Sequence, residues 1–230
     1  MVRLWLVPSA AVAALVILGP ALAYLEWVDP ARGFGLYFVG AFLAALSAGG
    51  FGAAAALASA LGKPWRRLAL RAAVLPLAVV LLAVAPSLNR TRWPYNDVST
   101  DLTDPPAFAV GPPADVPYPE EFAEAQREQF AEIEGSIELP LSVDRAVSLV
   151  VTVARAMPGW EGVEVAGPGL VQAVAVSRIF RFRDDLAIRV RSAGKGARID
   201  VRSRSRVGRS DLGANAERIH AFREALVAAR

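Results

Sequence analysis

Arginine recurs at every second position near the end of the sequence, a spacing that could build an anion-binding surface. Residues 178–209 hold eleven basic and three acidic residues. Successive side chains of a β-strand point to opposite faces, so arginines two positions apart share one face. A guanidinium group presents its N–H donors in a planar fork that matches carboxylate and phosphate groups. We therefore predict an anion-binding sheet face formed by Arg189, Arg191, Arg202, Arg204 and Arg206.

The sequence also contains an acidic stretch that could neutralise this face. Residues 96–138 hold eleven acidic residues and a single basic one, Arg127. If this stretch folds over the sheet, the arginines form internal ion pairs. If it can be displaced, or if the face is open, the arginines are available to an anionic partner. The sequence leaves both alternatives open.

A second set of polar residues could support catalysis. The site of an envelope hydrolase or another enzyme would lie near Asp184, Asp185, Asp211 and His220, with Ser203 or Ser205 as a nucleophile. No strand–elbow–helix pattern surrounds either serine, and paired aspartates are typical of a turn. One histidine and no cysteine cannot build a common zinc site. We expect no metal and no cofactor, and we favour a binding module over an enzyme.

The elements that must position these residues follow from periodicity and turn signals. Ser142 with Asp144 predicts the start of a helix, and Ser210 or Asp211 predicts the start of a second one. Four β-type segments with short turns lie between the helices, as in an antiparallel meander. We predict an α+β domain over residues 137–230, in which a helix, about four antiparallel strands and a helix follow one another. Both helices would cover one face of the sheet, and a proline-rich, acidic arm over residues 89–136 would precede the domain.

Three apolar runs, at about residues 4–25, 34–61 and 70–88, approach the length that crosses a bilayer as a helix. We predict three transmembrane helices that form a membrane unit over residues 1–88, and hence a multi-pass protein of the inner (plasma) membrane. The first run has an alternative interpretation, because Ala21-Leu22-Ala23 resembles the cleavage site of a signal peptide.

Loop charges predict the orientation of this unit. Lys63, Arg66, Arg67 and Arg71 are typical of a cytoplasmic loop, so the N-terminus would be cytoplasmic unless cleaved. The C-terminal domain would then be extracytoplasmic, in a periplasm where one exists. Because much of the basic excess lies beside the membrane, we expect no nucleic-acid partner.

The second apolar run repeats small residues at every fourth position, which lets two helices approach closely. This stripe could pack against a neighbouring span, or it could form a homo-oligomer through Gly40, Ala44, Ala48, Gly52 and Ala56.

Two motifs resemble a known family. One runs from Asn96 to Phe108, and the other runs from Asp200 through Asn215 to Ile219. Over roughly residues 95–228, the chain resembles the bacterial and plastid family catalogued as domain of unknown function 1499. The resemblance implies membrane anchoring but no activity and no set of catalytic residues. We therefore expect a membrane-anchored extracytoplasmic binding or envelope-assembly module. Its partners would be the lipid bilayer and an anionic envelope component or a membrane protein.

Overall fold

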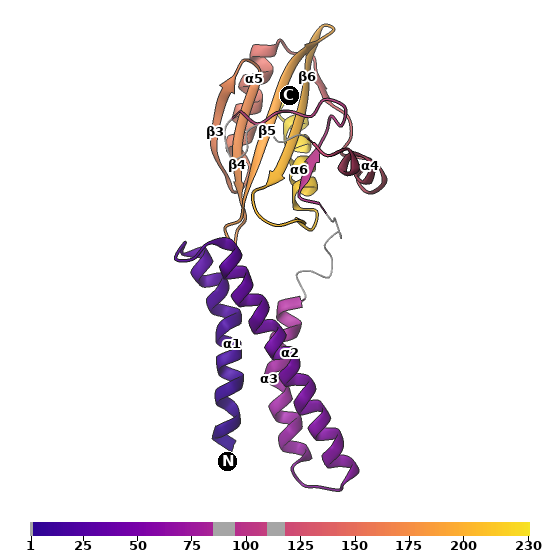
Figure 1. Cartoon of the computed structure of the whole chain (residues 1–230). Helices are drawn as coiled ribbons and strands as arrows, with labels where there is room; N and C mark the ends of the chain where they lie inside the picture. The colour runs from indigo at the N-terminus through magenta and orange to yellow at the C-terminus, as the bar shows by residue number, and fades with distance from the viewer. Residues whose placement is uncertain (1, 85–94, 110–117) are drawn as a thin grey trace. The chain divides into compact units, whose positions relative to one another are not determined.

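The computed structural model describes residues 2–84, 95–109 and 118–230, and the chain forms two compact units (Figure 1). The first, the helical unit, comprises Met1–Arg90 together with Arg178–Arg181. The second, the domain, comprises Thr91–Ser177 and Phe182–Arg230. Each unit has its own packing and is described by itself.

The helical unit is built from α1 (Val2–Tyr24), α2 (Pro30–Ala60) and α3 (Arg66–Val84). Asp29 caps α2, because its side chain accepts a hydrogen bond of 2.9 Å from the backbone N–H of Arg32. A glycine permits close packing of α1 against α2. A Cβ atom at Gly40 would lie only 2.8 Å from the side chain of Val16, so a larger residue would push the helices apart.

The prediction of three transmembrane helices is wrong for the part of the chain that the structure describes. There, one helix, α2, is long and apolar enough to cross a membrane. The helix α3 carries Arg66, Arg67 and Arg71 in its first two turns, which shortens its apolar part. Within α1, the apolar part that the structure describes with its side chains is Val12–Tyr24.

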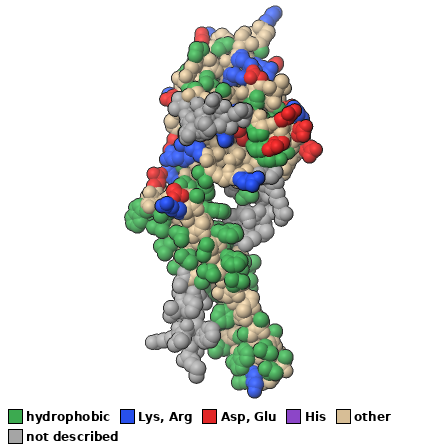
Figure 2. All heavy atoms as spheres, viewed as in Figure 1, with side chains coloured by type: hydrophobic (Ala, Val, Ile, Leu, Met, Phe, Trp, Pro, Cys, Tyr) green, Lys and Arg blue, Asp and Glu red, His purple; other side chains and the backbone are tan. Residues whose placement is uncertain are grey.

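Apolar side chains on the outside of α2 agree with a membrane environment. Phe38, Phe42 and Leu46 are all more than half exposed. Figure 2 shows hydrophobic side chains over much of the visible surface of the helical unit. A large exposed apolar surface is unfavourable in water but is satisfied by lipid. Among the residues that the structure describes, one helix is thus long and apolar enough to serve as a membrane anchor.

The domain contains a six-stranded antiparallel sheet rather than the predicted four-stranded meander. Its central path is β1-β6-β5-β4-β3, and β2 pairs with the same strand as β1, namely β6. The strands are β1 (Asp97–Ser99), β2 (Ile137–Leu139), β3 (Trp160–Gly167), β4 (Leu170–Val176), β5 (Arg183–Ala193) and β6 (Gly196–Ser205). The two additional strands, β1 and β2, have three residues each, which is too short to show an alternating pattern in sequence.

Two helices, α5 (Val143–Ala156) and α6 (Ala214–Ala228), pack on one face of this sheet and form the core with it (Figure 1). The helix α5 starts after Ser142, as predicted. Ile219 and Phe222 of α6 are fully buried, and Phe222 stacks on Trp160 with a centroid separation of 5.2 Å. A shorter helix, α4 (Glu120–Gln129), and β1 both lie within the predicted arm.

The turn predicted from the paired aspartates Asp184 and Asp185 is also wrong, because β5 begins at Arg183. The connection from β4 to β5 runs through residues 177–182 instead. Its Ile179 and Phe180 follow β4 after only two polar residues, Ser177 and Arg178, which conceals the end of that strand in sequence. Asp184 and Asp185 consequently lie in a strand that pairs with β6.

Candidate functional site

Three arginines lie side by side on the sheet face opposite the helices, and we call them the arginine cluster: Arg189, Arg191 and Arg198. The register of β5 on β6 brings them together. Arg191 is the cross-strand partner of Arg198, and Arg189 is the partner of Asp200. Directly opposed side chains of an antiparallel pair share a face and lie within contact distance. The sheet thus places three positive charges around the carboxylate of Asp200, which is fully buried.

A loop of residues 100–109, the covering loop, places further carboxylates on this cluster. Figure 1 shows the chain after β1 crossing in front of β5 and β6. Within the loop, Asp101 Oδ1 accepts hydrogen bonds from the backbone N–H groups of Thr103 (3.1 Å) and Asp104 (3.0 Å). These bonds leave Asp101 Oδ2 directed at the arginines.

The carboxylate oxygens of the cluster are shared between guanidinium groups. Asp101 Oδ2 lies 3.3, 3.2 and 2.7 Å from Nη2 of Arg189, Arg191 and Arg198, respectively. Asp200 Oδ2 accepts from Nη2 of Arg189 at 3.3 Å and of Arg191 at 3.1 Å. Asp104 completes the set, with Oδ2 at 2.8 Å from Arg191 Nη1 and 3.1 Å from Arg189 Nη1. Three guanidinium groups and three carboxylates therefore balance in charge.

The three carboxylates differ greatly in exposure. The side chain of Asp200 is fully buried and that of Asp101 is 8% exposed, whereas that of Asp104 is 63% exposed. Arg191 and Arg198 are 39% and 38% exposed. The hydrogen bond from Arg191 holds the pKa of the Asp104 carboxyl below its usual range, despite slight burial. Asp104 is thus an ionised carboxylate bound at the solvent-facing side of the cluster.

Arg202, also a predicted anion-binding residue, forms a buried ion pair instead. Its Nη2 lies 2.7 Å from Asp97 Oδ2, and its Nε lies 3.1 Å from Oδ1. The rings of Phe108 and Tyr118 flank its guanidinium at 5.0 and 5.3 Å. Burial raises the pKa of the Asp97 carboxyl, and the hydrogen bonds and charge of Arg202 oppose that rise. A guanidinium group that is buried and paired in this way stabilises the folded domain.

Of the remaining predicted arginines, Arg204 lies in β6 and Arg206 directly follows that strand, and each has a carboxylate nearby. Arg204 Nε is 3.9 Å from Asp97 Oδ2, and Arg206 donates to Asp185 with a shortest separation of 2.6 Å. The predicted arginines therefore pair with different carboxylates along the sheet. Only Arg189 and Arg191 belong to the arginine cluster.

Most residues of the alternative catalytic set meet on the opposite face of the sheet, at the start of α6. Asp184 accepts from Arg218 at 2.7 Å, and Ser203 donates to Asn215 at 2.6 Å. Asp211 accepts from the backbone N–H groups of Gly213 and Asn215 at 2.9 and 2.7 Å, which caps α6. Burial raises the pKa of the Asp211 carboxyl, and these two bonds oppose the rise. We call Asp184, Ser203, Ser205, Asn215 and Arg218 the polar network.

His220 lies outside the polar network. Its side chain is 54% exposed and lies 3.4 Å from Glu224 on the same helix. The structure therefore does not bring His220 together with Ser203, Ser205 and Asp211. Within the described residues, no group of three potential ligands could hold a metal ion.

Sequence reasoning missed Arg198, Asp101 and Asp104 as members of the site. Arg198 was visible in the alternation of β6, since it shares a face with Asp200 and Arg202. The two aspartates belong to the motif that begins at Asn96, but nothing local indicates their partners, which lie 85 to 97 positions away.

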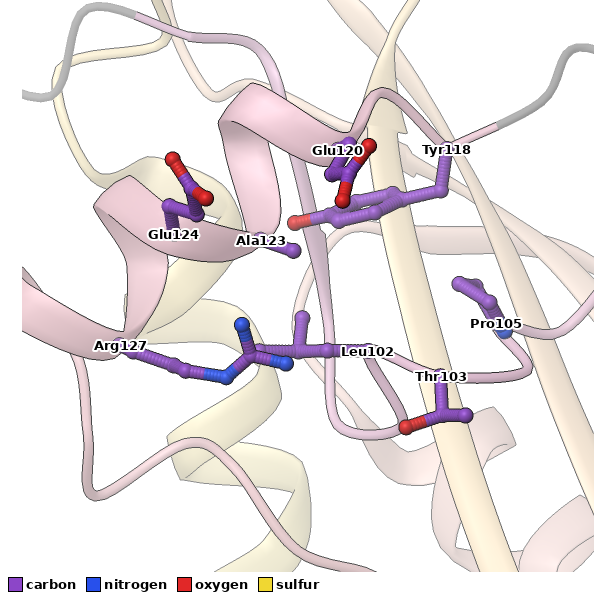
Figure 3. Close-up of a pocket in the computed structure, with 8 residues that line it drawn as sticks. All are labelled: Leu102, Thr103, Pro105, Tyr118, Glu120, Ala123, Glu124 and Arg127. Carbon is purple, nitrogen blue, oxygen red and sulfur yellow. The ribbon is translucent and has the colours of Figure 1, made fainter.

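The covering loop also lines a hollow of about 340 Å³ beside α4 (Figure 3). Leu102, Thr103 and Pro105 come from the loop, and the other lining residues are Tyr118, Glu120, Ala123, Glu124 and Arg127. Tyr118 donates a hydrogen bond of 2.8 Å to Gln126, and burial raises the pKa of its hydroxyl. One loop thus borders both this hollow and the arginine cluster.

Comparison with known proteins identifies one family. A family model described as "Protein of unknown function (DUF1499)" matches residues 97–226. The match begins at β1 and ends within α6, so it covers the sheet, the covering loop and the polar network but not the helical unit. Neither the curated proteins nor the solved structures contain a match.

Proposed function

We propose that this chain, which belongs to the DUF1499 family of proteins of unknown function, is a membrane-anchored module that binds an anionic group through its arginine cluster. One observation carries the proposal: three guanidinium groups converge on shared carboxylate oxygens, and the most exposed of those carboxylates, Asp104, sits on a loop. Several guanidinium donors around one oxygen are how proteins bind carboxylate and phosphate groups.

In this proposal Asp104 occupies the position of the external anion. Its carboxylate accepts from Arg189 and Arg191 at the solvent-facing side, while Asp101 and Asp200 hold the cluster from beneath. An incoming carboxylate or phosphate replaces Asp104 and takes over these two partners. Because ion pairs with exposed partners are weak, at about 1 kcal/mol or less, the exchange costs little.

Replacing Asp104 with asparagine should increase anion binding. The change leaves the cluster with one uncompensated positive charge at its exposed edge. We expect inorganic phosphate and citrate to bind the purified full-length chain roughly five- to tenfold more tightly, as for one added charge-assisted hydrogen bond. Isothermal titration calorimetry measures this change.

Two further variants make the experiment specific. Asp144→Asn removes an equal charge from an exposed position at the start of α5, away from the arginines, and should leave binding unchanged. Adding Arg191→Gln to Asp104→Asn should abolish the gain. Equal binding by Asp104→Asn and Asp144→Asn would show that the cluster has only a structural role.

A further inference from the structure

A groove in the helical unit lies between the C-terminal half of α2 and the start of α3. Its volume is about 580 Å³, and its walls are almost entirely apolar. Larger side chains line it at Phe51, Trp65 and Leu68. Small residues from both helices line the rest, among them Gly50, Ala54, Ala69 and Ala72. Because these side chains are small, the groove is open along the helices and could accommodate a hydrocarbon chain.

Four cations are neighbours of the groove-lining residues in sequence: one lies in the turn after α2, and three lie in the first two turns of α3. Lys63, Arg66, Arg67 and Arg71 are all exposed, and none of them forms an ion pair with any residue that the structure describes. The acidic residues among the first 95 positions are Glu26 and Asp29, at the opposite end of α2. Since α2 has 31 residues, its two ends are about 46 Å apart. The basic end therefore has no internal carboxylate within reach.

We infer that this groove binds an anionic phospholipid of the surrounding bilayer. One acyl chain lies along Gly50, Ala54, Ala69 and Ala72, and the phosphate lies at Lys63, Arg66 and Arg67. Trp65 lines the groove and directly precedes Arg66 in sequence, and tryptophan favours the boundary between hydrocarbon and headgroups. Basic pockets between membrane helices at the cytoplasmic side are suited to acidic headgroups. This inference concerns the helical unit alone and is independent of the function proposed for the domain.

The basic side chains should determine the choice of headgroup. The full-length chain in nanodiscs is titrated with fluorescent phosphatidylglycerol and with phosphatidylcholine of the same acyl chains. Wild-type protein should favour phosphatidylglycerol. In a variant that carries both Arg66→Gln and Arg67→Gln, the affinity for phosphatidylglycerol should fall by a factor of roughly five for each arginine. Its affinity for phosphatidylcholine should not change. An absence of preference in the wild-type protein would overturn the inference.

A matched pair of glycines tests the groove itself. Gly50 lines it and the neighbouring Gly49 does not, yet both are exposed and a Cβ atom at either position meets nothing within 4 Å. Gly50→Leu should fill the groove and lower the affinity for both lipids by about fivefold or more. Gly49→Leu should bind both lipids with the affinity of the wild type. Equal binding by the two variants would contradict the inference. If Gly50→Leu instead converted a dimer into a monomer with unchanged lipid binding, the groove would hold a second copy of the chain, and the lipid assignment would be wrong.

Discussion

Replacing Arg202 with alanine should destabilise the domain by about 3–5 kcal/mol, because it leaves the Asp97 carboxylate buried without its partner. The side chains of Arg202 and Asp97 are 3% and 2% exposed, so water cannot replace the lost bonds. The change also removes the cation that packs between the rings of Phe108 and Tyr118. Urea unfolding of residues 95–230, the stretch that contains the sheet and its helices, measures the loss.

Arg206, which directly follows the same strand, provides the control for this change. Arg206 pairs with Asp185, but its side chain is 33% exposed, so Arg206→Ala should cost about 1 kcal/mol or less. Combining Arg202→Met with Asp97→Leu removes both buried charges and should recover much of the stability lost in Arg202→Ala. If Arg202→Ala and Arg206→Ala were equally stable, the pair with Asp97 would not be buried in solution.

The same variant should show a dependence on pH with a defined sign. Burial already raises the pKa of Asp97, and losing Arg202 removes the influence that opposes the rise. A carboxyl with a raised pKa in the folded state binds a proton more readily there than in the unfolded chain. The destabilisation by Arg202→Ala should therefore be largest at neutral pH and should shrink as the pH falls toward about 4, the ordinary aspartate pKa.

The alternation of charged and apolar residues in β6 could be predicted, because side chains in a long strand repeat with a period of two. It identifies the faces of Arg198, Arg202 and Arg204 correctly. The partners of the arginines could not be predicted, since Asp101 and Asp104 come from a loop almost one hundred positions earlier. Ion pairing between distant segments leaves no periodic signal in a single sequence.

The membrane unit shows a similar limit. Composition alone predicts α2 as a span, because its apolar run contains no charge over residues 34–61. For α3, the run of apolar residues conceals that the helix begins earlier, at Arg66, so that three arginines belong to it. In the stripe of small residues, Gly40 packs against α1 and Ala44 is fully buried, whereas Gly52 and Ala56 are exposed. The homo-oligomer therefore stays a prediction for the exposed half of the stripe.

Replacing Asn215 with alanine should destabilise the domain by about 3 kcal/mol, because its fully buried amide connects the polar network. Its Oδ1 accepts from Ser203 and Arg218, and its Nδ2 donates to the backbone carbonyl of Asn96 at 3.0 Å and to Ser205 at 3.1 Å. Alanine removes all four bonds, and the Ser203 hydroxyl then keeps only the hydrogen bond that it accepts from Arg218. Thermal and urea unfolding of residues 95–230 both measure the effect.

His220 provides the matched control, since it lies on the same helix with an exposed side chain. His220→Ala should change stability by less than about 0.5 kcal/mol, as is usual for surface substitutions. The comparison decides what the motif from Asp200 to Ile219 contributes. If it encodes the fold, Asn215→Ala unfolds far more easily than His220→Ala. If Asn215→Ala instead remained within about 1 kcal/mol of His220→Ala, the amide would not hold the domain together, and a binding or catalytic role for the polar network would become the better interpretation.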